Sequence, residues 1–117
     1  MPGFIGWSGA YIAIGFEEGG ELKGGVVFTN CTPTNVNAAI VLEAPMTRRF
    51  LRAVFYYPFI QLKVKRITAL VDASNERSLN LTRKLGFKQE GRLREAAMDG
   101  GDTFVFGILQ RDCRYLT

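Results

Sequence analysis

The chain has 117 residues, of which 47% are hydrophobic and 22% are charged, with a net charge of +4. This length and composition predict one globular α/β domain over residues 1–117, and they exclude a second ordinary domain, a disordered chain and a collagen-like repeat. Because no apolar run approaches the roughly 18 residues of a membrane span, and the N-terminus lacks the basic region and cleavage site of a signal peptide, we expect a cytoplasmic protein that does not bind membranes.

The first half of the chain is typical of strands. Ala10–Glu17 and Leu22–Asn30 read as two strands joined by a glycine-rich hairpin turn. After a turn-rich stretch, Val36–Glu43 reads as a third strand that ends before Pro45. We therefore expect three antiparallel strands before any helix.

The hydrophobic period changes at Thr47, which is a credible helix N-cap. Apolar residues then recur at helical spacing, and Pro58 is expected to disturb this helix near its end. The apolar run Ile67–Asp72 suits a buried strand. A strand–helix–strand unit follows from this order.

A second helix is predicted over Glu76–Leu85, with Asn75 as its cap and Gly86 as its C-terminal stop. The chain then reads as a hairpin of Phe87–Ala97 and Thr103–Gln110, joined by a tight turn at residues 99–102. The expected order is β-β-β-α-β-α-β-β. This order predicts a mixed, mainly antiparallel sheet with two helices packed on it, an α/β (α+β) fold.

The sequence contains no histidine. This excludes Ser-His and Cys-His nucleophilic catalysis and histidine-based metal sites, together with the commonest general base at neutral pH. Cys31 and Cys113 form no C-x-x-C pattern, so no metal site is predicted and both are expected to be ordinary thiols. Chemistry at this chain must use carboxylates, hydroxyls, backbone amides or a bound cofactor.

Basic residues gather where the first helix is expected to begin, with Arg48, Arg49 and Arg52 close together. Unpaired N–H groups and the helix dipole favour a phosphate at such a position. A basic helix face that binds nothing is the alternative, and charge alone does not separate a nucleotide from a nucleic acid.

A more specific pattern lies in the second predicted helix, in the run N-x-x-S-x-x-L-x-x-K-L-G-F from Asn75 to Phe87, followed by Gln89–Arg94. This run resembles the C-terminal half of the GNAT superfamily of N-acetyltransferases. It is most similar to the branch that contains the ribosomal-protein N-terminal acetyltransferases. With the closing hairpin and tail, the resemblance extends over Leu22–Leu116.

The resemblance implies acetyl-CoA as co-substrate, with no metal. The family's pyrophosphate loop falls on Arg48–Ala53, with Leu51 in place of its first glycine. On the preceding strand, main-chain groups would pair with the pantetheine arm. Asn75 would hydrogen-bond the pantetheine or acetyl end, a role compatible with capping its helix. The implied cofactor-binding residues are Val41, Leu42, Glu43, Arg48, Arg49, Phe50, Leu51, Arg52, Ala53, Val54, Asn75 and Ser78.

For catalysis, the resemblance implies direct attack of an amine on the bound thioester in a ternary complex. Many relatives have a tyrosine that protonates the leaving thiolate, and Thr82 takes its position here. Glu43, next to the implied acetyl end, is the candidate base, and Asp72 is an alternative. A family glutamate on the strand before Asn75 is replaced by Leu70.

The sequence departs from the family at its N-terminus, where relatives usually have a strand and two helices that form much of the acceptor pocket. A partner subunit could complete this pocket, or the acceptor could bring its own surface. The aromatic residues Phe4, Trp7 and Tyr11 could then pack across a homodimer interface.

The predicted function is acetyl transfer from acetyl-CoA to a primary amine, which is either a small molecule, a protein N-terminus or a lysine. Two alternatives stay open. One is a catalytically silent acyl-CoA-binding or regulatory domain, favoured by Leu51 and Thr82. The other is a small basic nucleic-acid-binding domain, for which no recognition helix or aromatic-rich strand is seen.

Overall fold

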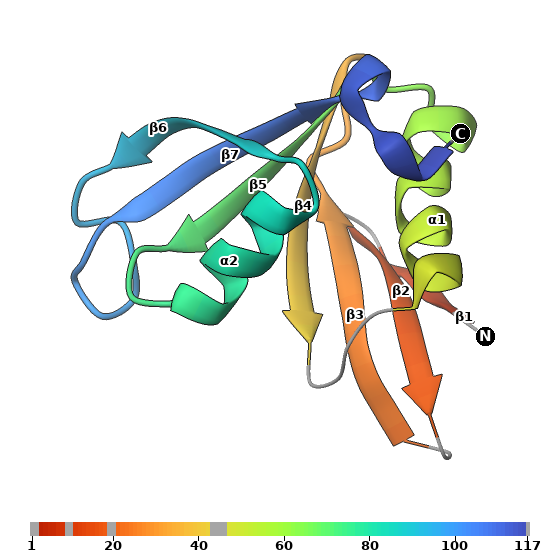
Figure 1. Ribbon diagram of the computed structural model, residues 1–117, viewed down its shortest axis with the longest axis horizontal. Coiled ribbons are helices and arrows are strands. Elements are labelled where there is room, and N and C mark those ends of the chain that lie inside the picture. Colours follow the sequence, from red (N-terminus) through yellow and green to blue (C-terminus); the bar gives the residue numbers. More distant parts are fainter. Residues whose placement is uncertain (1–2, 9–10, 19–20, 43–46, 117) are drawn as a thin grey trace.

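A computed structural model of the protein describes residues 3–8, 11–18, 21–42 and 47–116. In this part of the chain, strands form a sheet in the order β1-β2-β3-β4-β5-β7-β6 (Figure 1). Every neighbouring pair is antiparallel except β4 and β5, which run parallel. The strands are β1 Gly3–Ser8, β2 Tyr11–Glu18, β3 Glu21–Thr29, β4 Asn35–Leu42, β5 Arg66–Asp72, β6 Lys88–Leu93 and β7 Thr103–Leu109.

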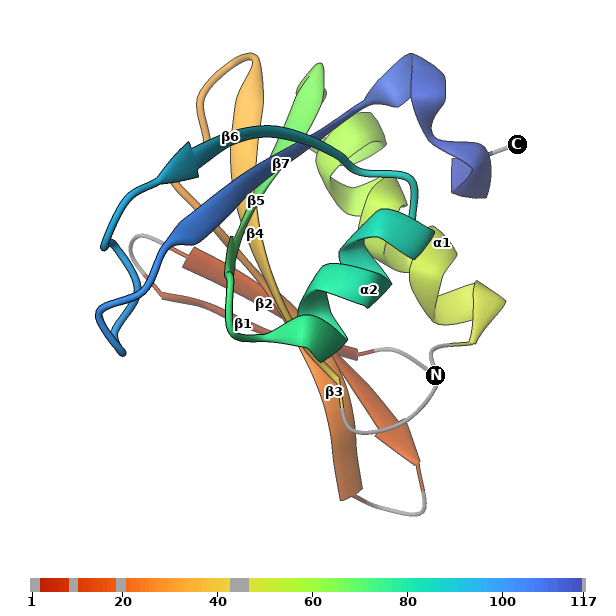
Figure 2. The same cartoon turned by 60° about the vertical axis from the view of Figure 1, so that its left-hand side comes forward.

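Two α-helices pack on one face of this sheet, as Figures 1 and 2 show. Helix α1 spans Arg48–Tyr56 and continues into a wider turn over Tyr57–Gln61, where Pro58 removes a backbone donor, as predicted. Helix α2 spans Glu76–Lys84. The described part of the chain also ends in two short 3₁₀ turns, Gln110–Asp112 and Arg114–Leu116. None of the described helices is long and apolar enough to cross a membrane.

The core lies between the helices and the sheet. It is built from inward-facing residues of β3, β4, β5 and β7 together with apolar residues of both helices. Along β5, side chains alternate between buried and more exposed positions, as expected for a strand with one covered face. Phe28, Phe50, Phe55, Phe59 and Phe106 are among its largest fully buried side chains.

The predicted α/β fold, a mixed and mainly antiparallel sheet with two helices, is confirmed, and two details need correction. A strand, β1, precedes those predicted and pairs with β2. Its Gly3 and Gly6 weaken the strand pattern in the sequence, and pairing with β2 compensates. The side chains of Phe4, Trp7 and Tyr11, for which a dimer contact was predicted, lie outside the described residues.

The second correction concerns the final hairpin, because β6 ends at Leu93, well before the predicted Ala97. The connection is a wide loop in which backbone N–H groups donate to aspartate side chains and not to a neighbouring strand. Asp99 Oδ1 accepts from the Gly101 N–H at 2.8 Å, and Asp102 Oδ1 accepts from the Glu95 N–H at 3.0 Å. Aspartate binds nearby backbone in this way in turns, at the expense of extended structure.

Candidate functional site

The parallel strands β4 and β5 separate part way along their length. Their pairing runs from Asn35 opposite Arg66 to Ala38 opposite Ala69. Beyond this point β4 continues beside β3, and β5 continues beside β7. The last residues of the two strands therefore point their facing backbone edges into a gap, and such an edge can pair with an extended ligand.

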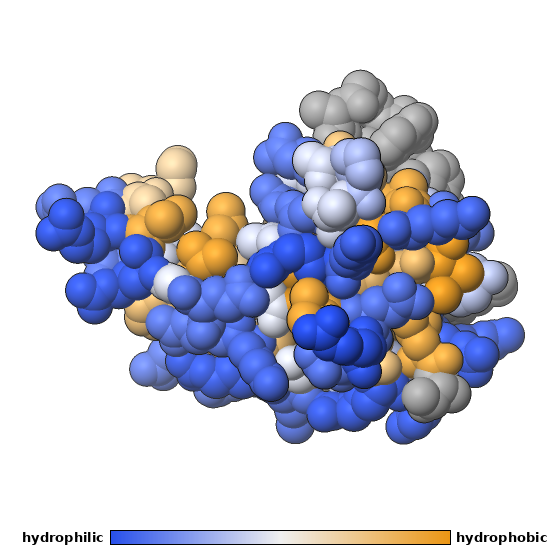
Figure 3. Space-filling model, turned by 90° about the horizontal axis from the view of Figure 1, so that it is seen from above, coloured by the Kyte–Doolittle hydropathy of each residue, from blue (hydrophilic) through white to orange (hydrophobic). Residues whose placement is uncertain are grey.

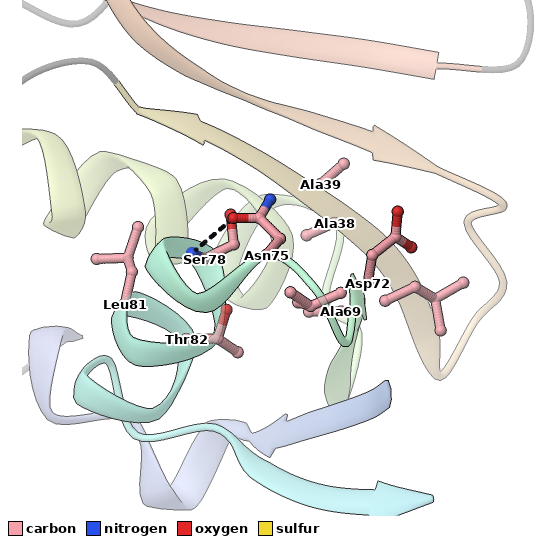
Figure 4. Close-up of a pocket in the computed structure, with 10 residues that line it drawn as sticks. Ala38, Ala39, Ala69, Asp72, Asn75, Ser78, Leu81 and Thr82 are labelled. Atoms are coloured by element: carbon pink, nitrogen blue, oxygen red, sulfur yellow. Dashed lines mark hydrogen bonds between the residues drawn. The ribbon is translucent and has the colours of Figure 1, made fainter. Parts of the chain in front are cut away.

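A pocket of about 160 Å³ lies at this gap (Figure 4). This volume is below that of pockets that enclose a drug-sized ligand, so the pocket fits only one end of a larger molecule. Its lining combines small residues from both strands with polar residues from α2 and the loop before it. The lining residues are Ala38, Ala39, Ala69, Leu70, Val71, Asp72, Asn75, Ser78, Leu81 and Thr82.

Helix α2 brings three polar side chains to the pocket, because Asn75, Ser78 and Thr82 recur at helical spacing on one face. Asn75 Oδ1 accepts from the Ser78 N–H at 3.2 Å and so caps the helix. The amide nitrogen of Asn75 is turned toward Ala38 and Ala39 in Figure 4. Asn75 thus caps the helix with one atom and presents a donor to the pocket with another.

Thr82 is only 2% exposed and lies deeper along the same helix. Thr82 belongs to the pocket lining, and a hydroxyl there can donate to or accept from a polar atom of a ligand. The predicted residues Asn75, Ser78 and Thr82 are thereby brought together.

Asp72 stands at the end of the pocket away from Leu81, with its carboxylate drawn on that side in Figure 4. Thr103 Oγ1 donates to its Oδ1 at 3.2 Å, and the Asn75 N–H donates to its backbone carbonyl at 3.0 Å. The first contact holds the carboxylate, and the second holds the backbone of Asp72 beside the pocket. Glu43, the base predicted first, lies outside the described residues.

The N-terminus of α1 carries the predicted basic group. Thr47 caps the helix, its Oγ1 accepting from the Phe50 N–H at 3.1 Å. The first turn contains no acidic residue, and Arg48, Arg49 and Arg52 are exposed. The helix dipole and the guanidinium groups therefore act in the same sense and attract an anion.

The apolar residues of the predicted phosphate loop point inward instead. Phe50 and Val54 are buried, and Leu51 is half-buried against the core. The side chain of Leu51 consequently packs inside the molecule, and its N–H donates to the Thr47 carbonyl as an ordinary helical bond. Among the apolar residues of this loop, only the backbone groups and the half-buried side chain of Ala53 are therefore left to contact a ligand.

Val41 and Leu42 lie on β4 beyond the last pair with β5. On one side their backbones pair with Gly25 and Gly24 of β3. Their other backbone edge faces the gap. This is the geometry that the resemblance implied for main-chain contacts with an extended arm.

Sequence reasoning missed several pocket residues, above all Ala38, Ala39 and Ala69. The sequence feature that could have identified them is a small side chain at three positions where neighbouring strands carry larger apolar residues. The spacing along the chain did not show that Ala38 lies opposite Ala69, since the parallel register decides that.

Both cysteines are free. Cys31 is exposed, and Cys113 is buried against the helices, where burial raises the pKa of its thiol. Within the described ranges, no three His, Cys, Asp or Glu side chains gather in a way that could hold a metal ion.

Comparison of the sequence with protein-family models and with curated proteins finds no match. Solved structures do match the fold. A structure described as "Probable acetyltransferase" is 20% identical with a TM-score of 0.75, over 87% of this chain and 62% of that one. A variant of the spermidine N-acetyltransferase SpeG from Vibrio cholerae is 25% identical with a TM-score of 0.75, over 93% of this chain and 70% of that one.

A second SpeG variant from the same organism is 24% identical with a TM-score of 0.74. The match covers 92% of this chain and 70% of that protein. The chain thus spans 62% to 70% of the length of these three acetyltransferase structures. Together with the strand separation and the motif on α2, the comparisons show that the chain has the GNAT-type N-acetyltransferase fold.

Proposed function

We propose that this protein is an acetyl-CoA-dependent N-acetyltransferase that moves the acetyl group to a primary amine. The observation that carries the proposal is the pocket between the separated strands β4 and β5, lined by Asn75, Ser78 and Thr82. A cytoplasmic location and a homodimer belong to the same proposal. Sedimentation of the purified chain at several concentrations tests the dimer.

Acetyl-CoA is expected to lie along the open edge of β4. Its pantetheine arm would hydrogen-bond the backbones of Val41 and Leu42, as an added strand does. Its pyrophosphate would meet the N-terminus of α1, where Arg48, Arg49 and Arg52 are exposed. The small pocket would then hold the thioester end.

In the reaction, the amine nitrogen attacks the thioester carbonyl carbon, a C–N bond forms and the C–S bond breaks. The carbonyl oxygen carries negative charge in the tetrahedral intermediate and needs a hydrogen-bond donor. The Asn75 amide and nearby backbone N–H groups at the β4 edge are the donors that we assign to the acetyl end. The protein supplies no covalent nucleophile.

One proton must leave the amine, and one must reach the departing thiolate. Asp72 lies at the pocket rim and can accept the amine proton directly or through one water. Glu43 remains the other candidate for this role. Thr82 would hydrogen-bond the sulfur, but a threonine hydroxyl is a much weaker acid than a tyrosine phenol, so solvent would supply this proton.

A second candidate function is a catalytically silent acyl-CoA-binding domain. Two observations favour it: Leu51 occupies the glycine position of the phosphate loop, and Thr82 occupies the tyrosine position. Both functions require acetyl-CoA to bind, and only the enzyme releases free thiol in the presence of an amine. Thiol release over a panel of amines therefore separates the two.

The test of binding is calorimetric titration with acetyl-CoA and with coenzyme A. Asn75→Ser keeps a helix-capping side chain and removes the amide, so it separates ligand contact from helix stability. We expect Asn75→Ser and Arg49→Ala each to raise the Kd for acetyl-CoA about tenfold, because each variant loses one charge-assisted or buried hydrogen bond to the ligand. Asn80→Ala and Arg94→Ala, at exposed positions outside the pocket lining, are the matched controls.

If wild type and Asn75→Ser bind acetyl-CoA with equal affinity, Asn75 does not contact the ligand. If wild type binds neither ligand, acetyl transfer by this chain is rejected. If it binds but no amine releases thiol, the silent domain is the better description.

A further inference from the structure

The gap between β4 and β5 is lined from both faces of the sheet. Along β5, Ala69 and Val71 are buried toward the helices, whereas Leu70 is 46% exposed on the opposite face. The pocket therefore has a helix side, with the α2 residues, and an outer side, with Ala39, Leu70 and Asp72. These two sides offer different chemistry to a ligand.

The register places apolar side chains around Leu70 on this outer side. Leu70 pairs with Val105, and Asp72 pairs with Thr103, which in turn pairs with Leu93. Side chains opposite one another in a sheet lie about 5 Å apart and diagonal neighbours about 7–8 Å apart. Leu70 is therefore opposite Val105, and Leu93 is diagonal to Val105 on the same face. We call these three residues the outer patch, and Asp72 borders it.

Leu93 is 46% exposed, the same fraction as Leu70, and Val105 is half-buried. In Figure 3, hydrophobic colour gathers beside the hollow that separates the β6–β7 part from the rest of the molecule. Exposed leucines are common singly, whereas these two lie on one face beside the pocket and so form a candidate binding surface.

The two sides of the gap assign the two substrates. The basic N-terminus of α1 and the polar residues of α2 suit the anionic acyl carrier on the helix side. The acceptor is then left with the outer side, where it meets apolar side chains and one carboxylate. An ammonium group next to Asp72 is complementary in charge, and an apolar substituent would be buried against the outer patch.

We propose that the acceptor is a primary amine with an apolar group next to its nitrogen, and that Leu70 is the residue that selects it. This inference rests on the proposed function and names its substrate class. A polycationic amine is disfavoured because its second charge would be placed against Leu70 and Val105. The same chemistry occurs in an arylalkyl amine and in a peptide that begins with leucine.

The experiment measures kcat/KM for thiol release with phenethylamine, with a tripeptide beginning with leucine, and with spermidine. Wild type should prefer at least one apolar amine over spermidine by about tenfold or more, since burial of a few apolar carbons carries that discrimination. Leu70→Glu should reduce this ratio about tenfold, because the new carboxylate beside Asp72 attracts the second charge of spermidine and removes the apolar contact. The two apolar arms distinguish a free amine from a peptide N-terminus.

Ile60→Glu is the matched control, since Ile60 is an exposed apolar residue, 39% accessible, outside the pocket lining. It should leave the ratio unchanged and should bind acetyl-CoA as wild type does. A wild-type preference for spermidine, or a ratio unmoved by Leu70→Glu, overturns the inference while leaving acetyl transfer intact.

A second measurement needs no turnover. Phenethylamine is titrated into protein saturated with coenzyme A while the methyl resonances of Leu70, Leu93 and Val105 are followed by NMR. Shifts at these methyl groups that spermidine does not cause support the inference. Absent shifts overturn it, whereas failure of the proposed function appears separately as absent binding of acetyl-CoA.

Discussion

The two ends of the β4–β5 pair make an instructive comparison. At the closed end, Asn35 to Ala38 pair with Arg66 to Ala69, and side chains tie the strands together. Thr68 Oγ1 donates to Asn35 Oδ1 at 2.6 Å and accepts from Arg66 Nε at 3.2 Å. Arg66 continues this network to Glu90 of β6 at 2.6 Å. At the open end the pairing stops and the pocket begins.

The comparison teaches that the site results from an interruption of regular structure. A parallel ladder that continued would satisfy the backbone groups of both strands, and no edge would remain for a ligand. Small side chains at Ala38, Ala39 and Ala69 mark where the strands part. The closed end therefore holds the strands together, and the open end would supply the binding groups of the proposed site.

The largest expected effect comes from removing a core side chain at the start of α1. Phe50, in the first turn of α1, is 0% exposed. Phe50→Ala should lower the free energy of unfolding by about 3–5 kcal/mol, because the lost contacts leave a cavity. Urea unfolding measures the change. Arg49→Ala, at an exposed position in the same turn, should unfold at nearly the same urea concentration as wild type. Equal losses for the two variants would contradict this packing role of Phe50.

A smaller effect is expected at the closed end. Thr68→Val keeps the shape of the side chain and removes the hydroxyl that joins Asn35 to Arg66. It should lower the free energy of unfolding by about 1–2 kcal/mol, since Asn35 loses a donor in a half-buried site. Faster amide exchange in residues 35–38 would accompany the loss.

Thr34→Val is the control for Thr68→Val, because Thr34 is exposed and its side chain is outside this network. If both variants unfold at the same urea concentration, the network does not hold the strands together at the closed end.

The smallest effect concerns the loop beside the open end, where Asp99 accepts from the Gly101 N–H and from Ser74 Oγ. These hydrogen bonds, that from Gly101 first, lower the pKa of Asp99. A lowered pKa means that the carboxylate stabilises the loop above the pKa of the unfolded chain. This contribution is lost as the pH falls through the folded pKa.

NMR titration of the Asp99 carboxyl should therefore give a midpoint below the ordinary value for an aspartate. Ser74→Ala should raise the midpoint toward the ordinary value. A midpoint that Ser74→Ala leaves in place would show that the side-chain contact is not formed in solution.

Local sequence signals predicted the elements that depend on neighbours in the chain. Thr47 and Asn75 cap their helices as predicted, since a cap needs only a backbone N–H three residues away. Pro58 disturbs the first helix for an equally local reason. The motif from Asn75 to Phe87 predicted the fold for a different reason, namely its resemblance to a known family.

The wide loop before β7 and the strand β1 were missed because both depend in part on contacts between residues far apart in the chain. Asp99 and Asp102 organise the loop through bonds to backbone groups and to Ser74, 25 residues away in the case of Ser74. β1 exists as a strand because β2 offers it a partner edge. Pairing across the sheet decides such elements.

By itself the sequence determined the helices with their caps, most of the strands, and the polar face of α2 that carries Asn75, Ser78 and Thr82. Helical spacing is a local property and places these three side chains together. The tertiary structure alone decided where β4 and β5 part, that Leu51 packs inward, and that Leu70 and Asp72 share the outer side of the gap. These facts depend on strand register and core packing, which are set by residues far apart in the chain.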